Sequence, residues 1–257
     1  MLTRIEASFR FYAELNDFLP ATRRQREFRA SFAADASLKH VIEALGVPHT
    51  EVDLILRNGH PACFEERLAP DDRIAIYPVF EAFDIASVQR LRAGPLRDSR
   101  FLADAHLGGL ARLLRMAGFD TLYRNDFADD EILALALAEE RIVLTRDREL
   151  LKRRELVRGC YVHAKKPIAQ IEEVLARLDL AAAMRPLTRC LACNEPLAPI
   201  AKEIVKDRLP EGVYERHSHF ATCARCASVF WEGSHYRRMQ ELLAALRATL
   251  VAPQQGV

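Results

Sequence analysis

The sequence predicts an α/β protein with three structural parts. Strand and helix patterns alternate between residues 100 and 186, which is typical of a parallel sheet with helices on its faces. Residues 1–83 mix strands and a helix in another order, and two Cys-x-x-Cys pairs lie after residue 187. At roughly 150 residues per domain, a chain of 257 residues is long enough for about two domains.

The composition is that of an ordinary globular protein, with 50% hydrophobic residues, 28% charged residues and a net charge of +1. This excludes a disordered or fibrous chain. The longest apolar run is residues 132–138, whereas a membrane-spanning helix needs about 18 apolar residues. The first residues contain no apolar core of the signal-peptide kind, so we expect a cytoplasmic protein that enters no membrane.

The N-terminal part, residues 1–83, is predicted to begin with two strands and a helix. Apolar and polar residues alternate over residues 5–11 and 28–32, which is the period of a strand. Ser37 is placed to cap a helix, because the apolar residues after it recur at helical spacing, and Gly46 is placed to end it.

Further strands follow the helix, with Asn58 and Gly59 as a tight turn between two of them. This order resembles the ubiquitin-like β-grasp fold, particularly the sulfur carriers. Those carriers work through a free C-terminal Gly-Gly, whereas here the last strand continues into more chain. We therefore expect a docking or stabilising module that could bind a protein partner, followed by a linker over residues 84–99.

The central part alternates strands with helices up to residue 186. The predicted strands are residues 100–104, 121–123, 142–145 and 159–163, and the predicted helices are residues 107–117, 129–140, 149–155 and 168–178. Asp104 and Asp147 each follow directly on a buried strand, and ligand sites in parallel sheets lie beyond the carboxyl ends of the strands.

Several carboxylates at one sheet edge need a counter-charge, and Mg²⁺ or Mn²⁺ is the usual one. Such a cation can activate water and stabilise the charge that develops on a phosphate. The strand at residues 121–123 is followed by further acids: Asp126, Asp129, Asp130 and Glu131. Each acid also has a structural interpretation, as a helix N-cap or a turn residue.

Three stretches of the central part resemble a known family. They are FLAD at residues 101–104, LARLLRMAGFD at residues 110–120 and LTRDREL at residues 144–150. They are similar to the Mut-seven C-terminal RNase family, a PIN-like domain with an appended zinc ribbon, in which some members carry an N-terminal ubiquitin-like domain. The resemblance implies a PIN-like domain over residues 100–186.

The resemblance also implies a metal-dependent ribonuclease that acts on RNA. Asp104 and Asp147 would be metal carboxylates, and Asp130 is the best candidate for the acid between them, with Asp129 and Glu131 as alternatives. PIN nucleases often place a fourth acid after the fourth strand, where this chain has two lysines. That difference predicts a site that binds one metal, binds it weakly or does not cut.

Basic residues near these acids are candidates for binding the RNA backbone. Arg112 and Arg115 lie three apart on one helix, and an arginine pair can bind a phosphate through two hydrogen bonds. The stretch 141–166 contains nine basic and three acidic residues, although a solvated helix surface explains it equally well. The full candidate set is Arg112, Arg115, Arg146, Lys165 and Lys166.

The C-terminal part, residues 187–257, is predicted to be a zinc ribbon with a C-terminal helix. Its four paired cysteines have the spacing of a closed, structural Zn²⁺ site: Cys190, Cys193, Cys223 and Cys226. Asn194 and Ala227 follow the two pairs, where glycine is common. The aromatic residues at 230 and 231 either stack on RNA bases or pack the ribbon on the nuclease-like domain.

Two functions of different classes therefore stay open. The first is a Mg²⁺- or Mn²⁺-dependent ribonuclease, and the second is an adaptor that binds RNA or protein without catalysis. Convergence of Asp104, Asp130 and Asp147 within reach of one metal favours the enzyme. A helix-cap role for Asp147, together with an Asp104 that faces solvent, favours the adaptor.

Overall fold

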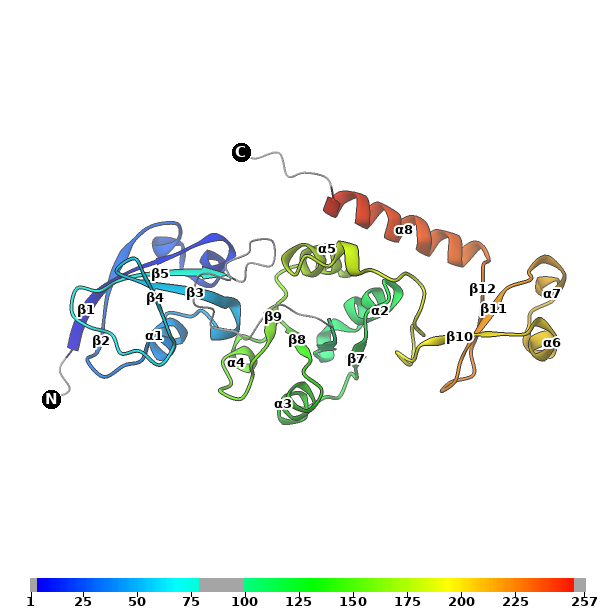
Figure 1. Ribbon diagram of the computed structural model, residues 1–257, viewed down its shortest axis with the longest axis horizontal. Helices are drawn as coiled ribbons and strands as arrows, with labels where there is room; N and C mark the ends of the chain where they lie inside the picture. Colours follow the sequence, from blue (N-terminus) through cyan, green and yellow to red (C-terminus); the bar gives the residue numbers. More distant parts are fainter. Residues whose placement is uncertain (1–3, 79–98, 252–257) are drawn as a thin grey trace. The chain divides into compact units, whose positions relative to one another are not determined.

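The computed structural model describes residues 4–78 and 99–251 (Figure 1). The chain divides into two compact units. The first unit contains residues 1–98 and 129–161, and the second contains residues 99–128 and 162–257. The predicted linker lies outside the described residues, except for Ser99.

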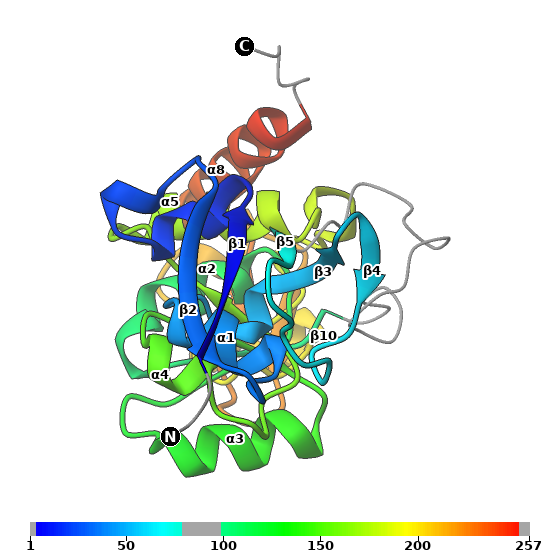
Figure 2. The same cartoon turned by 90° about the vertical axis from the view of Figure 1, so that its left-hand side faces the viewer.

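The first unit contains a five-stranded sheet in the order β2-β1-β5-β3-β4 (Figure 2). Strand β1 runs antiparallel to β2 and parallel to β5, while β3 runs antiparallel to β4 and β5. Helix α1 follows β2, so the predicted order of two strands, a helix and further strands is confirmed. The elements are β1 (Arg4–Phe11), β2 (Phe28–Ala33), α1 (Leu38–Ala44), β3 (Val52–Arg57), β4 (His60–Ala62) and β5 (Arg73–Pro78).

Local signals in the sequence account for these elements. The alternating apolar residues of β1 are buried and the residues between them are exposed or half-buried. The Ser37 hydroxyl accepts a hydrogen bond from the His40 amide and caps α1. Asn58 and Gly59 both have positive φ, as the tight turn between β3 and β4 requires. Three short 3-10 helices complete the domain: η1 (Ala13–Phe18), η2 (Ala21–Arg23) and η3 (His49–Glu51).

The first unit also contains part of the alternating strand and helix region. Strands β8 and β9 are parallel, as predicted. Helix α4 ends at Leu151, although its pattern predicted a helix to residue 155. The chain turns there, with the Leu156 amide bonded to the Arg153 carbonyl, so that Leu156 is buried as well as Leu150 and Leu151. The elements are α3 (Asp129–Ala138), β8 (Ile142–Thr145), α4 (Arg148–Leu151) and β9 (Gly159–Tyr161).

The second unit begins with two parallel strands, β6 and β7, connected through helix α2. Helix α2 packs against α5, and both present apolar residues to this contact. The elements are β6 (Phe101–Ala103), η4 (Ala105–Leu107), α2 (Gly108–Met116), β7 (Thr121–Tyr123), α5 (Pro167–Arg177) and η5 (Ala181–Ala183).

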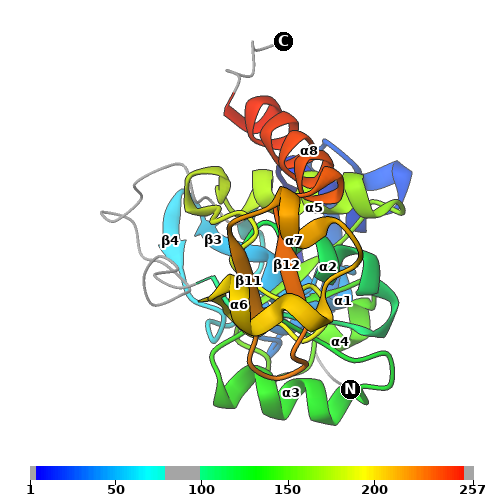
Figure 3. The same cartoon turned by 90° about the vertical axis from the view of Figure 1, so that its right-hand side faces the viewer.

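The remainder of the second unit is a three-stranded antiparallel sheet followed by a long helix (Figure 3). Its small core is formed by Val205, Val213 and Phe220. Trp231 packs against this core, and a contact of the aromatic residues with RNA bases or with the nuclease-like domain stays a prediction. The elements are β10 (Leu197–Ile200), α6 (Lys202–Val205), η6 (Lys206–Arg208), α7 (Val213–Arg216), β11 (Phe220–Cys223), β12 (Val229–Trp231) and α8 (Ser234–Val251).

Over residues 4–78 and 99–251, no helix is both long enough and apolar enough to cross a membrane.

Candidate functional site

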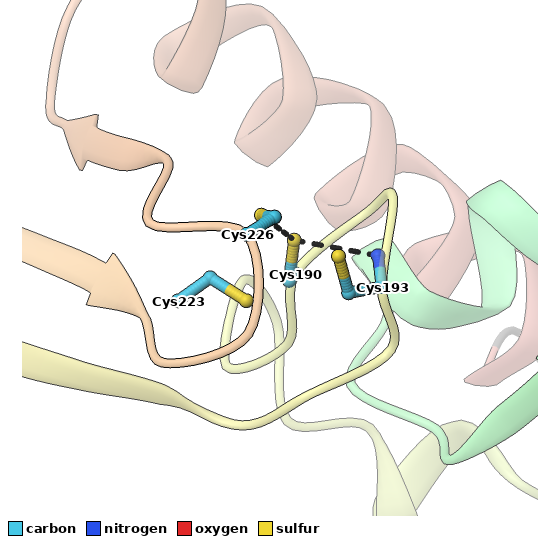
Figure 4. A group of neighbouring side chains, drawn as sticks. All are labelled: Cys190, Cys193, Cys223 and Cys226. Carbon is cyan, nitrogen blue, oxygen red and sulfur yellow. Dashed lines mark hydrogen bonds between the residues drawn. The ribbon is translucent and has the colours of Figure 1, made fainter.

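Four cysteine side chains from two loops point toward a common centre (Figure 4). Their sulfur atoms all lie within 4.8 Å of one another, and the sulfurs of Cys190 and Cys226 are 3.7 Å apart. Cys190 and Cys193 precede β10, Cys223 ends β11, and Cys226 lies in the turn before β12. Within the described ranges, this is the one group of three or more potential metal ligands found at such spacing.

The two loops have the same backbone geometry. The Asn194 amide donates to the Cys190 carbonyl, and the Ala227 amide donates to the Cys223 carbonyl, each at 2.9 Å. Both donors have left-handed backbone, with φ of 69° at Asn194 and 57° at Ala227. This conformation is the reason that glycine is common there, and asparagine adopts it more readily than alanine.

The donor set fits Zn²⁺, because four thiolates in a tetrahedron match its ligand preference and leave no open position. Hydrogen bonds within the cluster shift the pKa values of two thiols in opposite directions. The Ser228 hydroxyl, 3.1 Å from the Cys226 sulfur, lowers the pKa of Cys226 to about 6. Hydrogen bonding with Cys226, together with burial, raises the pKa of Cys193 to about 12.

Arg115 is a structural residue rather than a phosphate ligand, which corrects the prediction from its spacing. Its guanidinium is buried and donates to the carbonyls of Thr121, Leu191 and Ala192 at 2.8–3.1 Å. Burial lowers the pKa of Arg115, while the nearby Cys190 and Cys193 oppose this shift. Arg115 thereby joins α2, β7 and the first cysteine loop.

Asn194 makes a second connection between the first cysteine loop and β7, which the sequence did not predict. Its side-chain oxygen accepts from the Thr121 amide at 2.9 Å, and its side-chain nitrogen donates to Asp120 at 2.7 Å. Arg189 pairs with Asp120 and donates to the Asn194 carbonyl. The signal available in the sequence was an asparagine in the place of a glycine, which suggested backbone conformation but not these side-chain contacts.

Asp104 and Asp147 both cap helices. The Asp104 carboxylate is half-buried and accepts from the Ala105 amide at 2.5 Å, at the start of η4. The exposed Asp147 carboxylate accepts from the Glu149 amide at 2.8 Å, at the start of α4. For an adaptor, we expect a helix-capping Asp147 and an Asp104 that faces solvent. Asp147 does cap a helix, whereas Asp104 is half-buried.

Asp130 lies in the first turn of α3, and its carboxylate pairs with Arg153 at 3.0 Å. Its side chain is 87% exposed. Asp130 and Asp147 belong to the first unit and Asp104 to the second. The convergence of the three carboxylates therefore stays a prediction.

The other predicted phosphate ligands, Arg112, Arg146, Lys165 and Lys166, are exposed. The basic stretch that contains Arg146 does not form one uniform surface. Arg141 is buried and pairs with Glu139 at 2.7 Å, and other basic side chains in the stretch have partners of their own. Its local charge excess is thus a weaker indication of a nucleic-acid surface than the sequence suggested.

Comparison with known families bears out the predicted resemblance. The model of the Mut7-C RNAse domain matches residues 99–243, which is more than half of the chain. The chain belongs to the Mut7-C RNAse domain family. A second model, the Mut7-C ubiquitin domain, matches residues 4–84, so the N-terminal domain is ubiquitin-like.

A solved structure is similar to part of this Mut7-C chain. It is the small archaeal modifier protein 1 of H. volcanii, with 22% sequence identity and a TM-score of 0.24. The match covers 29% of this chain and 97% of the modifier. The search of curated proteins found no match.

The Mut7-C match treats the cysteine loops and the preceding α/β region as one domain, because residues 99–243 include both. The contacts of Arg115 and Asn194 link these two parts, since both tie the first cysteine loop to α2 or β7.

The loop after β9 contains the two lysines in place of the acid that PIN nucleases often have. An acid does reach this loop, because Glu173 of α5 accepts from the amides of His163 and Ala164 at 2.8–2.9 Å. Its carboxylate thus holds the loop backbone.

Proposed function

We propose that this Mut7-C chain is a ribonuclease that hydrolyses RNA phosphodiester bonds with the help of Mg²⁺ or Mn²⁺. The observation that carries the proposal is the position of two acids at strand ends. Asp104 directly follows β6, and Asp147 lies two residues after β8, each of which pairs with a parallel neighbour. Membership of an RNase domain family supports the same activity.

Asp104, Asp130 and Asp147 would hold the cation, because hard divalent cations prefer carboxylate oxygens. Helix capping is compatible with this role, since each cap bond engages one carboxylate oxygen and a carboxylate has about four acceptor positions. The exposed pair of Asp130 with Arg153 is worth about 1 kcal/mol at most, so Asp130 can exchange partners. When bound, the cation would activate water and neutralise charge on the phosphate.

The exposed basic residues would hold the RNA backbone in this proposal. Their role would be to bind phosphates through charge, without selecting a base sequence. The set is Arg112, Arg146, Lys165 and Lys166, without Arg115. The cysteine cluster would hold Zn²⁺ as a structural ion, and a protein partner would bind through the ubiquitin-like domain.

The second candidate function is an adaptor without catalysis. Two observations favour it: both Asp104 and Asp147 already serve as helix caps, and lysines stand where PIN nucleases often have a fourth acid. In this case the α/β region would be a scaffold for the ubiquitin-like domain and the cysteine loops.

Replacement of each capping aspartate by asparagine distinguishes the two functions. It removes the negative charge that would bind the metal but keeps the helix cap, because asparagine caps helices about as well as aspartate. We expect the parent chain to cleave mixed single-stranded and structured RNA with Mn²⁺. Asp104→Asn and Asp147→Asn should each lose about 100-fold or more in rate while staying folded, a scale typical for loss of a charge-stabilising group.

The matched control is Asp207→Asn, an exposed acid of η6 that should retain full cleavage. If the parent and the variants at Asp104 and Asp147 all behave alike, the ribonuclease proposal fails and the adaptor is favoured.

A further inference from the structure

The ubiquitin-like domain makes buried polar contacts with β9 and with the segment that leads into it. The amide of Tyr161 donates to the Glu51 carboxylate at 2.6 Å, and Glu51 is only 1% exposed. His49 Nε2 lies 3.0 Å from the Leu156 carbonyl oxygen, in a buried setting. Since a buried polar group is costly without its hydrogen-bond partner, these contacts hold the domain against β9.

The same domain also contacts both ends of α4. The Thr50 hydroxyl donates to the carbonyl of Leu151, the last residue of α4, at 3.3 Å. The guanidinium of Arg148, the first residue, donates to the Phe18 carbonyl at 3.3 Å. A helix of four residues is far below the length that is stable by itself, so its position depends on such contacts.

Two aromatic rings also contact the Arg148 guanidinium, in addition to its hydrogen bond with the Phe18 carbonyl. Its central carbon lies 5.1 Å from the centre of the Phe18 ring and 5.5 Å from that of Tyr161. The two rings meet edge to face, 5.2 Å apart, and Phe18 is nearly fully buried. Cation–π contacts at such distances are attractive. We call Phe18 and Tyr161 the aromatic clamp.

We propose that the ubiquitin-like domain positions the Asp147 carboxylate through the aromatic clamp and α4. Asp147 directly precedes Arg148 and bonds to the Glu149 amide, and its own amide donates to the Thr145 hydroxyl. A displacement of α4 would therefore move this carboxylate away from the end of β8. The inference rests on the proposed function of Asp147 as a metal ligand, and it makes Arg148 and Thr50 positioning residues.

The first test measures hydrogen exchange of the Glu149 amide, which needs neither metal nor substrate. Arg148→Ala removes the guanidinium from the clamp, and Thr50→Val removes the bond at the other end without changing charge. Both should speed exchange by about tenfold, and Thr50→Ser should restore the parent rate. The matched control is Arg23→Ala, which removes a similar contact with the Phe28 ring, 4.9 Å away, elsewhere in the same domain.

The second test measures kcat and KM for Mn²⁺-dependent RNA cleavage by the same variants. Positioning predicts that kcat falls about tenfold in Arg148→Ala and Thr50→Val while KM stays within about twofold, and that Thr50→Ser restores kcat. Arg148→Lys should regain part of kcat, because lysine keeps the positive charge near the rings. A rise of KM confined to Arg148→Ala would instead make Arg148 a phosphate ligand and overturn the inference.

The two tests separate this inference from the proposed function. If the parent does not cleave RNA, the proposed function fails, and exchange still decides whether the ubiquitin-like domain positions Asp147. If exchange in Arg148→Ala and Thr50→Val equals that of the parent, the inference fails whatever the activity. Faster exchange with unchanged kcat in an active parent would also overturn it.

Discussion

At the scale of single residues, one helix contains two arginines with different roles. Arg112 is exposed, whereas Arg115 is buried and bonded to three carbonyl oxygens, two of them in the first cysteine loop. Their spacing on α2 predicted a pair that binds phosphate. Spacing alone could not decide this, because Arg115 finds its partners 76 and 77 residues further along the chain.

Replacement of Arg115 should therefore lower the stability of the chain, whereas replacement of Arg112 should weaken RNA binding. Arg115→Ala leaves buried carbonyls without donors and should lower the free energy of unfolding by about 3 kcal/mol. Arg112→Ala should change it by less than about 0.5 kcal/mol, as is usual for an exposed site, and should weaken RNA binding instead. Thermal unfolding and RNA titration of both variants measure the difference. Weaker RNA binding by a fully stable Arg115→Ala chain would contradict the structural role.

At the scale of elements, the end of α2 is defined by Gly118. Its φ is +97°, and a Cβ added there would lie 2.0 Å from the carbonyl oxygen of Arg185. The amides of Arg185 and Leu187 donate to the carbonyls of Ala117 and Met116, both at 2.8 Å. The segment before the cysteine loops thus packs directly on the C-terminus of α2, and only glycine leaves room for it.

Gly118→Ala should consequently destabilise the chain by about 2–5 kcal/mol. About 1–2 kcal/mol comes from the left-handed backbone, and the rest comes from the clash, since overpacking typically costs about 1–3 kcal/mol. The control is Gly59→Ala, which has a similar φ of +85° but no atom within 4 Å of the added Cβ. It should lose about 1–2 kcal/mol. Equal losses in urea unfolding of the two variants would show that the Arg185 contact is unimportant.

At the scale of the whole molecule, a bound Zn²⁺ would contribute more to the stability of the cysteine region than its packing does. Three residues form the buried core of its sheet, namely Val205, Val213 and Phe220. So small a core contributes little, whereas a structural Zn²⁺ site supplies about 10 kcal/mol or more of folding free energy at neutral pH. The ubiquitin-like domain has a much larger apolar core of its own.

Acidification should therefore release Zn²⁺ and unfold the cysteine region before the ubiquitin-like domain. Hydrogen bonding with Cys226 raises the pKa of Cys193 to about 12, and burial raises the pKa of Cys190, so binding at pH 7 displaces both protons. Because protons compete, these two protons alone should make the apparent Zn²⁺ affinity fall by at least about 100-fold per pH unit on acidification from pH 8 to 7. Chelator competition measures the affinity, and hydrogen exchange locates the unfolding.

Below about pH 6, protonation of Cys226, whose pKa the Ser228 hydroxyl lowers to about 6, should make the fall steeper. An affinity independent of pH, or simultaneous loss of protection in residues 4–78, would contradict this account.

Most of the local structure was predictable from the sequence. The alternation in β1, the Ser37 cap, the Asn58-Gly59 turn and the spacing of the four cysteines each depend on residues close together in the chain, or on ligand chemistry that allows few alternatives. The same holds for Asn194, whose left-handed backbone follows from its place after the cysteine pair. Motif resemblance then indicated the family, which the comparison bears out.

Only the tertiary structure decided which side chains have buried partners. It assigned Arg115 and Asn194 to the junction of α2, β7 and the first cysteine loop, and it placed Arg148 in the aromatic clamp. The bonds from Arg115 to the cysteine loop, from Thr121 to Asn194 and from Arg148 to Phe18 join residues that are 73 to 130 positions apart. Periodicity and capping preferences report on neighbours within a few residues, whereas burial of a charge is decided by whatever the folded chain brings beside it.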